Sequence, residues 1–207
     1  MDLERDMEIP RAQIIGNNMK KGLMSLLIAT SALLNCFLSR SSAESHPRFE
    51  QPILITSAGQ SADVQIGGVL AKRGGLTATL SKNATYQELA DKKTLALVIG
   101  VSMKGLGAAG LDLDQEKTRV RALIEEAQRE GIPLLCLHLG GEARRGELSD
   151  QMIHAFLPYA QVAIVVKSGN KDGLFTKICT ENNIPLHEVD RASDVQQHLK
   201  SIFSQTG

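Results

Sequence analysis

The sequence predicts an α/β fold, a three-layer sandwich around a mostly parallel sheet of five or six strands, flavodoxin-like or Rossmann-like. From residue 51 onward, short apolar runs recur, each followed by a Gly- or Ser-rich loop and then a helical stretch. Three of the runs are apolar nearly throughout, as strands covered on both faces are. Strand–helix alternation with short connections implies right-handed crossovers and favours the strand order 2-1-3-4-5.

The expected strands are the apolar runs themselves. Pro133 and Pro185 fall at the starts of two of them, where a missing backbone N–H costs little. The second run is short and is the least certain strand of the set. The expected strands are Pro52–Ser57, Thr77–Leu80, Thr94–Val101, Ile132–Leu139, Gln161–Val166 and Pro185–Val189.

The expected helices lie between these runs. The longest has apolar residues at helical spacing, with Asp114 as its N-cap, and it ends at Gly131 with Pro133 just beyond. Two glycines end the first helix, and a proline ends the fourth. The expected helices are Ser61–Arg73, Tyr86–Ala90, Asp114–Glu130, Ser149–Leu157, Gly173–Glu181 and Ser193–Phe203.

Residues 1–43 are expected to be an N-terminal extension followed by a signal peptide. Met19, Lys20 and Lys21 precede an uncharged stretch over 22–38, and small residues at 41 and 43 suit cleavage after Ala43. An uncleaved anchor and a lipoprotein acylated at Cys36 remain alternatives.

After cleavage, residues 44–51 form a loose arm and 52–207 a single α/β domain. The protein is therefore expected to be exported, periplasmic or extracellular. It touches a membrane only if the signal segment is kept.

The composition excludes several classes of protein. The chain has 23 basic and 23 acidic residues and no Trp, so neither a basic footprint nor stacking platforms for nucleic acid are present. The histidines are scattered, no Cys or His pair has metal-ligand spacing, and no Walker A sequence occurs. We therefore expect no metal or cofactor. Cys136 and Cys179 either pair in an oxidising compartment or are buried free thiols, which we favour.

Residues 105–110 spell G-x-G-x-x-G, but the context does not fit a dinucleotide site. That fingerprint forms the strand-to-helix turn itself and needs an acidic residue at the end of the next strand. Here the next helix is expected only near Asp114, and the next strand ends in His138 and Leu139. A mobile Gly-rich flap over a site, or an irregular solvent loop, fits the segment better.

Ligands of open α/β sheets bind beyond the carboxyl ends of the strands, near the reversal of strand order. The loops expected there are rich in small and polar residues, and they hold Lys104, Arg144, Arg145, Lys167 and Lys171. We expect these loops to bind a small anionic molecule, with an envelope transporter or sensor as the partner that such a binding protein would serve. Solvated loop charges neutralised by acidic neighbours are the alternative. The expected ligand-binding residues are Ser57, Gln60, Ser61, Ser102, Lys104, His138, Glu142, Arg144 and Asn170.

Two other classes of function remain open. Residues 59–63 (GQSAD) lie at a strand–turn–helix junction, where a nucleophile elbow would lie, although the second Gly of G-x-S-x-G is missing. Ser61, His138 and Asp190 would complete a hydrolase triad on paper, whereas a helix cap explains Ser61 equally well. A non-enzymatic assembly partner without a pocket is the third class.

Three segments resemble a family of exported bacterial proteins known only as a domain of unknown function. They are ITSAGQSADVQ (55–65), HLGGEARRGELSD (138–150) and VKSGNKDGLF (166–175). The resemblance covers nearly all of the chain after residue 51. It implies export and an α/β fold, and it carries no activity and no functional residue.

Overall fold

The computed structural model describes residues 48–204, which form one six-stranded sheet. All neighbouring strands pair in parallel, in the order β2-β1-β3-β4-β5-β6. The predicted fold class and strand order are thereby confirmed, with a sixth strand added at the edge. The strands are β1 (Ile53–Ala58), β2 (Ala78–Leu80), β3 (Thr94–Ile99), β4 (Leu134–His138), β5 (Val162–Val166) and β6 (Leu186–Val189).

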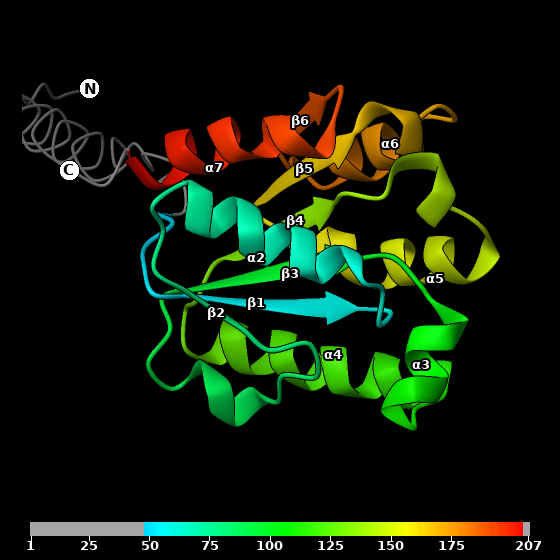
Figure 1. Cartoon of the computed structure of the whole chain (residues 1–207), viewed down its shortest axis with the longest axis horizontal. Helices are drawn as coiled ribbons and strands as arrows, with labels where there is room; N and C mark the ends of the chain where they lie inside the picture. The colour runs from blue at the N-terminus through cyan, green and yellow to red at the C-terminus, as the bar shows by residue number, and fades with distance from the viewer. Residues whose placement is uncertain (1–47, 205–207) are drawn as a thin grey trace, which may run out of the picture. The chain divides into compact units, whose positions relative to one another are not determined.

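Helices cover both faces of this sheet. Figure 1 shows α2 and α7 above the sheet and α4 below it; α5 and α6 contribute to the same core as α4. The expected helix at 86–90 is a single 3-10 turn, Tyr86–Leu89. The helices are α2 (Asp63–Arg73), α3 (Met103–Ala109), α4 (Leu113–Arg129), α5 (Glu147–Phe156), α6 (Leu174–Glu181) and α7 (Val195–Ser204).

The central strands are buried on both faces, so their residues alternate between two hydrophobic cores. Leu95, Leu97 and Ile99 of β3 face the core shared with α4, α5 and α6. Ala96 and Val98 face the core shared with α2 and α7. This two-sided burial explains why the strand sequences are continuously apolar rather than alternating.

Two helix starts differ from the sequence expectation. The N-cap of α4 is Asp112, not Asp114; its carboxylate accepts from the N–H of Gln115, whose side chain accepts from the N–H of Asp112 in return. Helix α5 begins at Glu147, before Ser149, because Ser149 is buried and its Oγ accepts from the N–H of Val101.

Cys136 and Cys179 are free and buried, as favoured from the sequence. Burial raises the pKa of the Cys179 thiol to about 11 and that of Cys136 well above its usual range, with a further contribution from Cys179. Both thiols are therefore protonated small hydrophobes, because a thiolate in either place would lose its hydration.

The end of the segment expected to be a loose arm is anchored. Phe49 is 4% exposed and its ring lies edge-on to Phe203 of α7. The backbone of Glu50 donates to Oγ1 of Thr94 and accepts from the same hydroxyl. The predicted signal segment lies outside the described residues. Within residues 48–204, no helix is long and apolar enough to cross a membrane.

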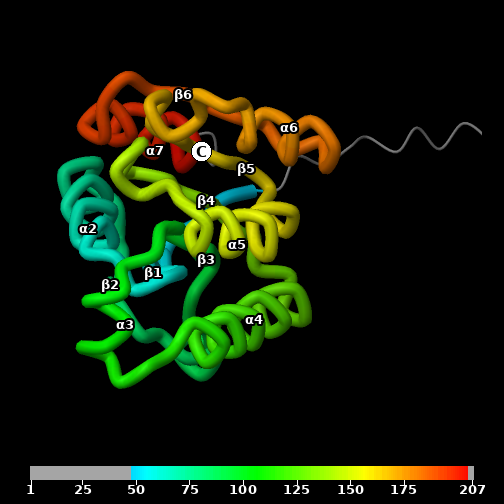
Figure 2. Tube along the Cα trace, turned by 90° about the vertical axis from the view of Figure 1, so that its right-hand side faces the viewer, coloured from blue at the N-terminus to red at the C-terminus, as the bar shows by residue number. Residues whose placement is uncertain are grey.

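The G-x-G-x-x-G segment forms helix α3, which the sequence did not predict. Figure 2 looks onto the carboxyl edge of the sheet and shows α3 between α2 and α4. A Cβ on Gly105 would lie 2.0 Å from the carbonyl oxygen of Gln60, so α3 approaches the β1–α2 loop as closely as backbone allows. Gly110 ends the helix with φ 67°.

This close approach predicts opposite outcomes for two glycines in one helix. Gly105→Ala should destabilise the fold, because α3 must move away from Gln60 to make room. Gly107→Ala meets nothing within 4 Å, so it should stabilise by about 0.5–1 kcal/mol. Urea unfolding of the two variants measures both effects, and equal effects would contradict the packing described.

Candidate binding site at the carboxyl edge of the sheet

The strand order reverses between β1 and β3, and the β1–α2 loop lies over that point. Gly59 has φ 113°, and a Cβ there would lie 2.6 Å from the carbonyl oxygen of Gly100, so the position requires glycine. Gln60 also has a positive φ, 61°. The N–H of Ser102 donates to the carbonyl of Gly59 at 2.9 Å. The loop is thus closed onto the end of β3.

A buried ion pair in α4 holds this loop from below. Glu116 is 0% exposed; its carboxylate accepts from the N–H of Gly59 at 2.9 Å and from Nε2 of Gln60 at 3.0 Å. Arg119 binds the same carboxylate through Nε and Nη2 and also donates to the carbonyls of Ser57 and Ala84.

The two partners of this ion pair satisfy each other's charge. Burial raises the pKa of Glu116, but the bonds and charge of Arg119 and the bonds from Gly59 and Gln60 outweigh burial, so the pKa lies below its ordinary value. Glu116 is therefore a carboxylate whenever the protein is folded near neutral pH.

On the α2 side of the sheet, Arg144 lies at the same edge. Its Nε donates to Asp63 in the first turn of α2 at 3.0 Å. Its aliphatic stem passes between two glycines at strand ends: a Cβ on Gly100 would meet it at 3.4 Å and a Cβ on Gly140 at 2.0 Å. Among residues 48–204, neither Nη1 nor Nη2 of Arg144 has a hydrogen-bond partner.

In the neighbouring Arg145, unlike Arg144, all three guanidinium nitrogens form hydrogen bonds. Its guanidinium forms paired bonds with Asp150 and with Asp172, and it also donates to the carbonyl of Gly169. Bonds with Asp172 and then Asp150 raise its pKa, and bonding to Arg145 holds the pKa of Asp172 near 2. Arg145 also lies over the ring of Phe175. Its donors are used in joining the loop after β4 to the start of α5 and to the loop after β5.

His138 is fully buried with both ring nitrogens facing backbone carbonyls. Nδ1 lies 3.0 Å from the oxygen of Ile99, and Nε2 lies 3.0 Å from the oxygen of Gly141. Burial lowers the pKa of this histidine and outweighs the two carbonyls, which favour the proton. His138 therefore joins β3 to the 3-10 turn Gly141–Arg144, and it offers no free nitrogen to a substrate.

The nine predicted site residues all lie at this edge, but the sheet divides them. Ser57 follows the alternation of Ile53 and Ile55 and faces α2, as Arg144 does, and its Oγ is buried without a hydrogen-bond partner among the described residues. Gln60 faces Glu116 across the sheet, and its Oε1 is likewise without a partner.

Several other predicted residues serve the fold. Ser102 caps α3 by accepting from the N–H of Gly105. Asn170 caps α6 and bonds Glu188. Glu142 and Lys171 pair at the surface, as do Lys167 and Asp190. Lys104 is exposed on α3 and, within residues 48–204, forms no ion pair.

The residues proposed for a hydrolase do not meet. Oγ of Ser61 accepts from the N–H of Asp63 at 3.1 Å, in the turn that leads into α2, whose N-cap is Ala62 and not Ser61. Within the described part of the chain, neither Ser57 nor Ser61 contacts a histidine, and Asp190 bonds Lys167 instead of His138. A nucleophile within reach of a base, which acyl transfer needs, is not assembled there.

Sequence reasoning missed Asp63, Glu116 and Arg119, which organise the edge. The spacing of Glu116 and Arg119 (i, i+3 in a helix) was a usable signal. The burial of this pair could not be predicted, because a charged pair on an amphipathic helix ordinarily faces water. Asp63 is 81 residues from Arg144, and nothing in the sequence links the two.

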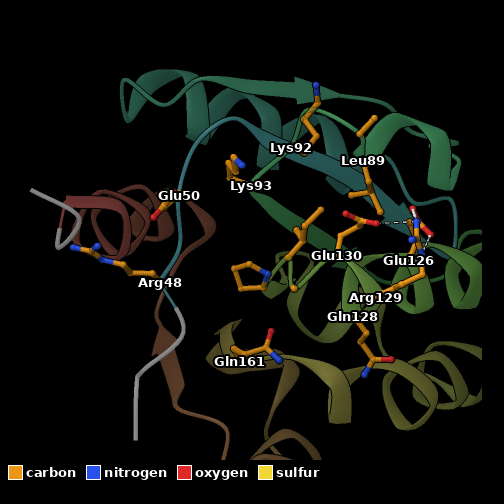
Figure 3. Close-up of a pocket in the computed structure, with 14 residues that line it drawn as sticks. Arg48, Glu50, Leu89, Lys92, Lys93, Glu126, Gln128, Arg129, Glu130 and Gln161 are labelled. Atoms are coloured by element: carbon orange, nitrogen blue, oxygen red, sulfur yellow. Dashed lines mark hydrogen bonds and ion pairs between the residues drawn. The ribbon is translucent and has the colours of Figure 1, made fainter. Parts of the chain in front are cut away.

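A hollow lies at the opposite, amino edge of the sheet. It has a volume of about 910 Å³. Figure 3 shows that side chains of Arg48 and Glu50, of the turn ending at Lys93 and of the end of α4 surround it. Glu126 and Glu130 bind Arg129 there. Cations and carboxylates alternate around this wall, so it favours neither sign of ligand.

Comparison with known proteins shows the family of the chain and leaves its activity open. Residues 50–203 match a family described as "Domain of unknown function (DUF6305)". No curated protein matches the chain.

Two solved structures share the general fold. A GDSL-like lipase from Bacteroides thetaiotaomicron is 12% identical, with a TM-score of 0.33 over 77% of this chain and 76% of that one. The SGNH-hydrolase family esterase AlinE4 is 14% identical, with a TM-score of 0.27 over 67% and 74%. A likeness this distant carries no argument about function.

Because the ion pair is buried, replacing Glu116 by its amide should lower the free energy of unfolding considerably. Glu116→Gln leaves Arg119 without its counter-charge and should destabilise by about 3 kcal/mol or more. Glu126→Gln removes the same contact at the same spacing from a pair at the surface and should cost far less, because solvent screens that pair. Equilibrium unfolding in urea measures both. Equal, small losses would show that Glu116 does not secure the loop.

The lowered pKa of buried His138 predicts that the free energy of unfolding falls in acid. Its lowered pKa means that the unfolded chain binds a proton below about pH 6.5 while the folded chain does not. Stability should therefore drop by up to about 1.4 kcal/mol per pH unit below that point, until the folded pKa is reached. Unfolding free energies between pH 7.5 and 5.5 should show a shallower slope for His138→Gln. The slope does not vanish, because burial also lowers the pKa of His187. An unchanged slope would contradict this assignment.

Proposed function

We propose that this chain, which belongs to the family described as "Domain of unknown function (DUF6305)", is a binding domain for a small anionic ligand. Arg144 is the anchor of the site. The observation that carries the proposal is that Arg144 is held in place at the carboxyl edge while most of its donors remain unused.

An arginine positioned through Nε alone is suited to bind an anion. Asp63 engages only that nitrogen, so the two terminal nitrogens of Arg144 keep four N–H donors in a planar fork. A carboxylate or phosphate accepts two parallel bonds from such a fork. Because Gly100 and Gly140 enclose the stem, little side-chain freedom is left to lose on binding.

The surroundings add weaker support. Helix α2 begins at Asp63, and its first turn presents backbone N–H groups and a partial positive charge at this edge. Ser57 places a buried hydroxyl without a protein partner on the same face of the sheet. The Asp63 carboxylate opposes an anion, so the proposal depends on the fork of Arg144 exceeding that repulsion.

Binding accounts for the geometry better than catalysis does. The hydroxyl of Ser61 accepts from the N–H of Asp63 in the turn before α2, and the ring of His138 faces two carbonyls. A reaction would require those groups to be released from their contacts first. Anion binding requires only that a ligand occupy donors of Arg144 that the described residues leave unused.

Inorganic phosphate is the probe that tests this proposal. Phosphate should raise the melting temperature of the wild-type chain, since a ligand of the folded state stabilises it. Arg144→Gln should weaken phosphate binding, measured by calorimetry, by roughly tenfold or more, the loss expected for a hydrogen bond between charged groups. Arg121→Gln removes an exposed cation from α4 and should leave the affinity unchanged.

Affinity, and not melting temperature alone, decides the test. Arg144→Gln also leaves the largely buried Asp63 without its ion pair, so some stability is lost in any case. If Arg144→Gln and Arg121→Gln reduce phosphate affinity equally, binding reflects overall charge, and the proposed site is wrong.

A further inference from the structure

Two histidines lie side by side where helix α7 packs on β6, the last strand of the sheet. His187 is in β6, the edge strand, and His198 is in α7. Their ring centroids are 5.1 Å apart, with the ring planes tilted by 41°. Both side chains are half-buried, so the rings cover one another and still reach solvent.

The ring nitrogens of both histidines remain available to a ligand. Within residues 48–204, no ring nitrogen of His187 or His198 donates or accepts a hydrogen bond. His138, in contrast, has a partner for each nitrogen. Half-buried imidazoles in a protein ordinarily bond a carboxylate, a carbonyl or water.

Local structure explains how the two rings meet. Alternation along β6 puts Leu186 and Glu188 on the side of α6, where Glu188 bonds Asn170. His187 and Val189 therefore point to the side of α7, where Val189 packs in the core with Leu199. His198 precedes Leu199 on that helix and stands at the margin of the same core.

We propose that His187 and His198 form a binding site for a divalent late transition-metal cation, with Zn²⁺, Ni²⁺ and Cu²⁺ as the ions that imidazole pairs suit. With metal–nitrogen bonds of about 2.0–2.1 Å, two coordinating nitrogens lie roughly 3 Å apart. Rings whose centroids are 5.1 Å apart reach that separation by rotation about their side-chain bonds, without movement of the backbone.

The site has two protein ligands. No group of three or more His, Cys, Asp or Glu side chains among the described residues could hold a metal. Asp194, one helical turn before His198, already accepts from the N–H of Arg191 and from the hydroxyl of Ser193. Water completes the coordination, so the bound ion keeps open positions and binds less tightly than in a four-ligand structural site.

The site is independent of the proposed anion site, since it lies at β6 and α7 while the anion site lies beyond the ends of β3 and β4, beside the start of α2. Each can fail without the other.

Isothermal titration of the full chain with Zn²⁺ alone at pH 7.5 tests the proposal. The wild-type chain should bind one Zn²⁺ at this pair, and His187→Gln or His198→Gln should each reduce that affinity by roughly tenfold or more, because a single imidazole offers no chelate. His154→Gln, which removes an exposed histidine from α5, should leave the affinity unchanged.

A second measurement separates binding from folding. Zn²⁺ should raise the melting temperature of the wild-type and His154→Gln chains and not that of the His187→Gln/His198→Gln double variant. The proposal is overturned if either single variant binds Zn²⁺ as tightly as the wild-type chain. It is also overturned if the double variant is stabilised by Zn²⁺ to the same extent.

Discussion

The buried ion pair between Glu116 and Arg119 is the constraint on which the carboxyl edge depends. It lies below the point where the strand order reverses, and there the β1–α2 loop needs partners for its backbone groups. Glu116 binds an N–H and a side-chain amide of that loop, while Arg119 binds a carbonyl at the end of β1 and another before the 3-10 turn Tyr86–Leu89. A charged pair is costly to bury. Here the cost is offset because each charge also satisfies backbone groups that have no ladder partner.

With the loop fixed, the opposite face of the sheet edge is free for another role. Two adjacent arginines have different roles there. Arg145 bonds two carboxylates and a carbonyl and joins the loops after β4 and β5. Arg144 is fixed by one bond to Asp63 and by glycines on both sides of its stem. The same residue type thus serves as a structural tie at one position and as a preorganised donor at the next.

The sequence predicted the fold well because the relevant signal is local. Continuous apolar runs mark strands buried on both faces, and Gly131 and Pro133 mark the end of α4. The N-cap of α4 was misplaced by two residues because Asp112 and Asp114 are chemically equivalent caps, and only Gln115 three residues after Asp112 distinguishes them. Helix α3 was missed because two glycines within it lower helix propensity, while its close contact with Gln60 compensates.

The site could be predicted only in outline. Parallel strands bring their carboxyl ends together, and all nine candidate residues do lie at that edge. Which of them remain available depends on partners distant in sequence: Asp63 for Arg144, Asp172 for Arg145, Ile99 for His138. A sequence does not state those pairings. The contact of His187 with His198 likewise depends on how α7 crosses β6.

The central claim is that the ligand binds at the carboxyl edge of the sheet, and not in the hollow at the amino edge. Titration of isotope-labelled protein with inorganic phosphate, followed by amide and arginine side-chain NMR, tests it most directly. The account predicts saturable shifts at Arg144 Nε–H and at the amides of Asp63, Gly100 and Gly140, which surround that side chain. Shifts confined to Lys92, Lys93 and Arg129 at the amino-edge hollow, with none at Arg144, would contradict it.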